Sequence, residues 1–102
     1  MELMNIMELQ ELIDESHKIA KEKGFWDEER PISEKLMLIV TEVAEACEAD
    51  RNGDEESFNR ELADVFIRLA DLCGKKNIFI EYYIRRKMEI NKDRPYKHSK
   101  LY

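Results

Sequence analysis

Hydrophobic and polar residues follow one another along this chain with the three- and four-residue spacing of amphipathic helices. This spacing predicts a first helix from Asn5 to Lys23, with Glu8 completing a capping box near its start and Gly24 following its end. Its apolar positions form a single stripe. The stripe contains Leu9, Leu12, Ile13, Ser16, Ile19 and Ala20. We therefore expect one face of this helix to pack against the rest of the protein.

The next segment, residues 24–32, shows no period and is predicted to be a loop. It carries two large aromatic side chains, Phe25 and Trp26. After the loop, the pattern predicts a second helix that begins with Ser33 as its N-cap residue and ends at Arg51.

The second and third helices are expected to form an antiparallel hairpin. An Asn-Gly pair at positions 52–53 predicts a left-handed helix end, and Asp54 can cap a third helix that extends to Cys73 and stops at Gly74. The connection has few residues, so the two helices should lie side by side. A fourth helix is predicted over residues 77–93, before an Arg-Pro pair. The chain is therefore predicted to be all-α.

Composition supports this prediction and limits the function. The 102 residues suit a single domain, 1–102, whose small core favours association into oligomers. A net charge of −6 argues against general binding to nucleic acids. The sequence predicts a cytoplasmic protein, because it shows neither a targeting segment nor an apolar run long enough for a membrane span. Cys47 and Cys73 are expected to be reduced core thiols.

Charge is distributed unevenly between the two parts of the chain. Residues 1–74 carry 8 basic and 20 acidic side chains, whereas residues 75–102 carry 9 basic and 3 acidic ones. This contrast suits the binding of a metal together with a polyanion, although a solvated basic C-terminal face has the same composition.

Two pairs of carboxylates occupy the predicted hairpin. Glu42 and Glu45 are three residues apart in the second helix, and Glu61 and Asp64 have the same spacing in the third, so each pair shares a face. Apolar residues at helical spacing around Glu42 and Glu61 place these acids on the sides that should meet in the hairpin. We therefore expect four carboxylates to converge and to repel one another unless cations lie nearby.

A divalent metal ion is the simplest source of that positive charge. Arg60 and Arg68 can neutralise part of the cluster but are too few for four acids. Ligands that are all oxygen atoms favour Mg²⁺, with Mn²⁺ as a substitute. A di-iron bundle would need Glu-x-x-His pairs, whereas His17 and His98 lie in the first helix and the tail. A single such pair of acids in a chain this acidic would indicate only a solvated helix face.

The acidic motifs resemble a known family. Residues 42–45 read EVAE and residues 61–64 read ELAD, which is similar to the ExxE...ExxD signature of MazG-like nucleotide pyrophosphohydrolases, the all-α NTP pyrophosphatases. About three quarters of the chain follows the order and spacing of short members of that family. The further segments are GFW at 24–26, EKLMLIVTEVAEACEADRNG at 34–53, ELADVFIRLADL at 61–72 and KMEINKDRPYKHSK at 87–100.

The resemblance implies a four-helix antiparallel bundle that forms dimers or tetramers. It also implies hydrolysis of a nucleoside triphosphate to the monophosphate and pyrophosphate, as in nucleotide-pool housekeeping. The metal ligands carried over are Glu42, Glu45, Glu61 and Asp64. One carboxylate would serve as the base, and Glu45, at the edge of the apolar stripe, is our choice, with Glu42 beside it.

Residues that contact the nucleotide follow from the same resemblance. Lys87 and Asn91 share a face of the fourth helix and are implied to contact phosphate or sugar, with Arg94 nearby at the start of a basic tail, residues 94–102. Trp26 either stacks on the nucleobase or packs into an oligomer core, and the sequence leaves both readings open.

Two hypotheses of function remain. The first is a Mg²⁺-dependent nucleoside triphosphate pyrophosphohydrolase. The alternative is a non-catalytic helical module that binds a metal or a basic protein partner without turnover.

Overall fold

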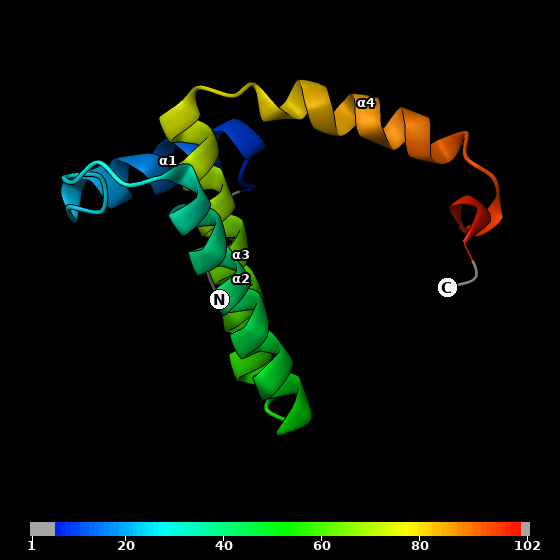
Figure 1. Ribbon diagram of the computed structural model, residues 1–102, viewed down its shortest axis with the longest axis horizontal. Helices are drawn as coiled ribbons and strands as arrows, with labels where there is room; N and C mark the ends of the chain where they lie inside the picture. The colour runs from blue at the N-terminus through cyan, green and yellow to red at the C-terminus, as the bar shows by residue number, and fades with distance from the viewer. Residues whose placement is uncertain (1–5, 101–102) are drawn as a thin grey trace.

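The computed structural model describes residues 6–100, which form four α-helices and one short 3₁₀-helix, with no strand (Figure 1). The elements are α1 (Leu9–Glu22), α2 (Ile32–Arg51), α3 (Glu55–Lys76), α4 (Ile80–Lys92) and the 3₁₀-helix η1 (Tyr96–Ser99). The predicted all-α class is therefore confirmed. Within the described part of the chain, no helix has the length and apolar character needed to cross a membrane.

Three of the four helices pack together. α2 and α3 form the expected antiparallel hairpin, and α1 lies across α3 near the end where α4 begins (Figure 1). α4 extends away from the hairpin and buries none of its residues. The expected four-helix antiparallel bundle is thus not formed within a single chain, since the fourth helix does not pack against the other three.

The turn between α2 and α3 follows the predicted chemistry. Gly53 adopts a left-handed conformation with φ 69°. At the start of α3, the Asp54 carboxylate accepts hydrogen bonds from the Ser57 backbone N–H at 3.1 Å and from the Ser57 hydroxyl at 2.7 Å. These two bonds hold the pKa of Asp54 below its ordinary value, because they favour the ionised carboxylate.

The end of α3 differs from the prediction. Gly74 lies inside the helix, which continues to Lys76 and ends at Asn77 in a left-handed conformation with φ 53°. Gly74 faces α1, where an added Cβ would lie 2.7 Å from Cβ of His17. The glycine therefore allows α1 and α3 to approach closely, and Asn77 supplies the helix end.

Other helix boundaries also shift. α1 begins at Leu9, and Glu8 at its N-cap position makes no side-chain capping bond, while Asn5 lies outside the described residues. Pro31, not Ser33, precedes the first turn of α2, because proline's fixed φ and missing N–H suit a helix start. α4 begins at Ile80, three residues later than predicted.

The core is small and consists mainly of small side chains. The buried apolar residues are Ile13, Ala20, Ile39, Ala46, Ala49, Ala70 and Leu72. Alanine at the helix contacts lets the backbones lie close together but buries little apolar area. Cys47 is exposed, so its assignment to the core was wrong, whereas Cys73 is partly buried and burial raises the pKa of its thiol. Neither cysteine forms a disulfide.

Replacement of Gly74 tests the contact between α1 and α3. We expect Gly74→Ala to lower the free energy of unfolding by about 1–3 kcal/mol, because the new methyl group overlaps His17. The gain in helix propensity from alanine is smaller, about 1 kcal/mol. Urea unfolding followed by circular dichroism measures the change. Asn59→Ala, at an exposed position of the same helix, is the control, and an equal effect of the two substitutions would contradict the proposed contact.

Candidate metal centre and adjoining cleft

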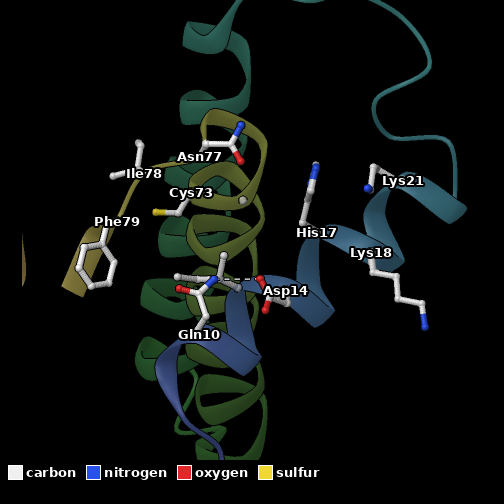
Figure 2. A pocket seen from close by; sticks show the side chains of 11 residues that line it. Gln10, Asp14, His17, Lys18, Lys21, Cys73, Asn77, Ile78 and Phe79 are labelled. Carbon is white, nitrogen blue, oxygen red and sulfur yellow. Dashed lines mark hydrogen bonds between the residues drawn. The ribbon is translucent and has the colours of Figure 1, made fainter. Parts of the chain in front are cut away.

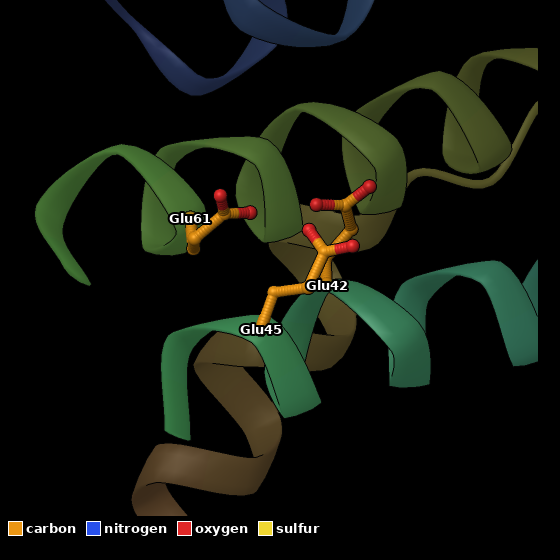
Figure 3. A group of neighbouring side chains, drawn as sticks. All are labelled: Glu42, Glu45 and Glu61. Atoms are coloured by element: carbon orange, nitrogen blue, oxygen red, sulfur yellow. The ribbon is translucent and has the colours of Figure 1, made fainter. Parts of the chain in front are cut away.

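Three glutamates from the two helices of the hairpin converge on one point. Glu42 and Glu45 project from α2 and Glu61 projects from α3, and one carboxylate oxygen of each lies within 4.8 Å of the others (Figure 3). Asp64, the fourth predicted ligand, does not join this group. It lies one turn beyond Glu61 and is exposed.

The group is only partly neutralised by protein cations. The Glu42 side chain is 12% exposed, and its Oε1 accepts a hydrogen bond from Nε of Arg68 at 3.0 Å. Arg68 therefore neutralises part of the acidic group, as the sequence predicted. Arg60 instead pairs with the exposed Glu56. Among the described residues, no ion pair reaches Glu45 or Glu61.

Glu61 has the least favourable environment of the three. Its Oε2 is buried, and none of the residues 6–100 forms a hydrogen bond with it. Ionised carboxylates cannot donate to one another, but a proton on Glu61 would allow it to donate to a neighbour. Hydrogen bonding with Glu42, then burial, then hydrogen bonding with Glu45 and repulsion from both carboxylates raise the pKa of Glu61 from 4.5 to about 7. The environment of Glu61 therefore favours added positive charge, whether a proton or a cation.

This chemistry fits a hard divalent cation. Three carboxylates from adjacent helix faces supply only oxygen ligands, and the buried Oε2 of Glu61 is a ligand atom without another use in the described structure. Exposed acidic groups occur commonly without metal, so the partial burial of Glu42 and Glu61 is the feature that distinguishes this group from a solvated helix face.

A largely apolar cleft of about 620 Å³ is lined by Arg68, the partner of Glu42, although none of the three glutamates lines it. α1, the following loop, α2 and α3 all contribute to it, and Trp26, Leu38 and Ile67 are among its apolar walls. Asp64 and Arg68 lie at its border with the acidic group, since Arg68 binds Glu42. The volume lies within the range of about 300–1,000 Å³ typical of small-molecule sites.

Trp26 is held in this cleft by polar contacts that the sequence analysis did not foresee. Its indole N–H donates to both carboxylate oxygens of Asp71, at 2.9 and 3.2 Å, and Nδ1 of His17 lies 2.9 Å from the same carboxylate. Nζ of Lys35 lies 4.5 Å from the ring centroid and donates to the carbonyl of Phe25 at 2.8 Å. The one signal in the sequence was a polar residue, His17, within the first helix, and Asp71, which joins it to Trp26, lies 54 positions away from it.

A second cleft, of about 400 Å³, lies between α1 and the end of α3 (Figure 2). Gln10, Asp14 and His17 from α1 contribute polar groups, and Gln10 donates to Asp14 at 2.9 Å. None of the three converging glutamates lines either cleft. Arg68, which binds Glu42, lines the larger cleft but not the smaller one, so the larger cleft is the better candidate for a ligand near the acidic group.

The structure does not bring the predicted phosphate-binding residues to the glutamates. Lys87 and Asn91 are exposed on α4, and Arg94 is exposed just beyond its end. All three belong to the segment that extends away from the hairpin (Figure 1).

No protein family, curated protein or solved structure matches this chain.

The raised pKa of Glu61 predicts a pH dependence of stability in the absence of divalent metal. Its folded-state value of about 7 exceeds the ordinary value of 4.5, so the folded protein holds the proton more tightly. The resulting stabilisation is complete below pH 4.5 and is lost as the pH rises through 7. In thermal melts with EDTA, the stability of the wild type should therefore fall as the pH rises from 4.5 to 8, and Glu61→Gln should lack this part of the decrease. Glu48→Gln, an exposed change on α2, should keep the wild-type dependence.

Proposed function

We propose that this protein is a Mg²⁺-dependent nucleoside triphosphate pyrophosphohydrolase. The observation that carries the proposal is the buried oxygen of Glu61, unpartnered among the described residues, beside Glu42 and Glu45. Arg68 joins Glu42 to a cleft large enough for a nucleoside. The resemblance of residues 42–45 and 61–64 to the paired acidic motifs of the MazG-like enzymes supports the choice of reaction.

Glu42, Glu45 and Glu61 would hold the metal, and the resemblance adds Asp64, one turn from Glu61, as a fourth ligand. The ion supplies positive charge that neutralises the triphosphate oxygens and polarises the α-phosphorus, and Mn²⁺ would serve in its place. The Arg68 guanidinium, which donates to Glu42, offsets part of the negative charge of the three glutamates.

The reaction consumes one water molecule. Water attacks the α-phosphorus, the bond from that phosphorus to the oxygen bridging to the β-phosphate breaks, and pyrophosphate leaves. Glu45 is the most exposed of the three glutamates, and its second carboxylate oxygen, not needed for the metal, would accept the proton of the attacking water. The products are the nucleoside monophosphate and pyrophosphate.

The apolar cleft would receive the nucleoside. The hydrogen bonds from Trp26 to Asp71 fix the indole ring, so that a wall of the cleft is rigid before ligand binds. Lys35, which lines the same cleft, contributes a positive charge toward a phosphate or a base carbonyl. A rigid aromatic wall with few polar groups is typical of sites that bind planar ligands.

Loss of Glu61 tests the reaction. We expect Glu61→Gln to lower Mg²⁺-dependent pyrophosphate release by about 100-fold or more, because a ligand for the charge-stabilising ion is lost. A panel of ribo- and deoxyribonucleoside triphosphates is incubated with protein and Mg²⁺, and pyrophosphate is separated from orthophosphate. Glu48→Gln should keep the wild-type rate. Binding without turnover by the wild type would instead support a non-catalytic module, and orthophosphate alone would indicate another hydrolysis.

Metal binding should also be visible without substrate. At pH 8, Mg²⁺ at about 100 times its dissociation constant should stabilise the wild type by about 2.7 kcal/mol through mass action. Thermal melts with and without Mg²⁺ measure the effect. Glu61→Gln should show a much smaller rise, and an equal rise in both proteins would place the metal elsewhere.

A further inference from the structure

Lys35 and Arg68 are the basic residues that line the larger cleft, and they differ in how their donors are used. Nζ of Lys35 already donates to the carbonyl of Phe25 at 2.8 Å. Arg68 uses Nε, which donates to Oε1 of Glu42 at 3.0 Å. In the described part of the chain, no hydrogen bond or ion pair uses its terminal nitrogens, Nη1 and Nη2. The side chain is 40% exposed, so these N–H groups can exchange water for a ligand.

The position of Arg68 joins the acidic group to the cleft. Its Nε reaches from α3 to Glu42 on α2, one of the three glutamates that converge within 4.8 Å, and the same side chain lines the cleft. A guanidinium group is planar and rigid. An anion bound at Nη1 and Nη2 would therefore stay at a fixed distance from the carboxylate bound at Nε.

The other charges of the cleft make Arg68 the favoured place for an anionic group. Glu15, Asp64 and Asp71 also line the cleft and repel anions. The Asp71 carboxylate is in addition occupied by the indole N–H of Trp26. The remaining walls are mainly apolar. The cleft therefore suits a ligand with an aromatic or apolar body and an anionic group that lies beside Arg68.

We propose that Arg68 binds the phosphate nearest the nucleoside with Nη1 and Nη2 while its Nε holds Glu42. The choice of a nucleotide rests on the proposed function, whereas the anion contact itself follows from the cleft and its charges. This phosphate contains the α-phosphorus. The guanidinium would hold it toward the metal ligands and offset the charge that develops on its oxygens as water attacks.

The substitution Arg68→Lys tests this assignment, because lysine keeps the positive charge but replaces the planar fork by a single nitrogen. Trp26 is the single tryptophan of the chain and lines the cleft, so its fluorescence reports binding there. The common ribo- and deoxyribonucleosides and their 5′-monophosphates are titrated in excess Mg²⁺. We expect Arg68→Lys to weaken monophosphate binding by about 10-fold or more, since charge-assisted hydrogen bonds are lost, and to leave nucleoside binding unchanged.

Arg60→Lys is the matched control, since it makes the same change on the same helix. Arg60 pairs with the exposed Glu56 and does not line the cleft, so both affinities should stay at the wild-type values. Mg²⁺ should still raise the melting temperature of Arg68→Lys, because the three glutamates are unchanged. Arg68→Gln, a second variant without the charge, should show the same selective loss and replaces Arg68→Lys if that protein does not fold.

Turnover provides a separate measurement. Arg68→Lys should lower kcat for pyrophosphate release by about 100-fold, because a donor to the reacting phosphate is lost. A role limited to holding Glu42 would instead change the affinity for Mg²⁺ and would leave the ratio of monophosphate to nucleoside affinity as in the wild type.

The outcomes separate this assignment from the proposed function. If Arg68→Lys weakens nucleoside and monophosphate equally, or neither of them, Arg68 does not bind the phosphate, and a wild type that releases pyrophosphate keeps its proposed function. A wild type without pyrophosphate release refutes that function. Monophosphate binding that depends on Arg68 would then still support the anion contact, and a wild type that binds no monophosphate would overturn it as well.

Discussion

The accumulation of negative charge between α2 and α3 is the constraint on which the rest of this structure depends. Three glutamates approach within 4.8 Å where helices in contact usually place apolar residues, and in the described part of the chain only Glu42 has an arginine partner. Ionised together, they oppose formation of the hairpin. A proton on Glu61 or a divalent cation relieves that repulsion. Protonation or cation binding at these atoms would therefore be coupled to folding.

The packing around the site explains why a small chain can hold such a group. Alanines at positions 46, 49 and 70 bring the helices close together, and Gly74 admits His17 from α1. His17 in turn lies beside Asp71, which fixes Trp26 in the cleft. The close packing of α1 against α3 thus shapes the apolar cleft at the same time as it stabilises the hairpin. As a result, the core is small and large apolar areas stay exposed on the described chain.

Local sequence rules were sufficient where a few neighbouring residues control the backbone. Residue spacing sets the faces of a helix, and a short turn forces two helices to pack antiparallel. These rules predicted the four helices, the turn at Gly53 and the Asp54 cap. They also predicted that Glu42, Glu45 and Glu61 converge. The rule that a glycine marks a helix end failed at Gly74. The close approach of α1 requires a residue without a side chain at this position. In the sequence, a glycine that admits a neighbouring helix looks the same as one that ends a helix.

The sequence by itself thus determined the helical elements, the acidic hairpin and the residue types at the candidate centre. Only the tertiary structure decided that Asp64 stands apart from the three glutamates, that Asp71 joins His17 to Trp26, and that α4 points away from the site. Helical periodicity fixes which residues share a face within one element. The orientation of one element relative to another depends on contacts between residues far apart in sequence, which no local pattern encodes.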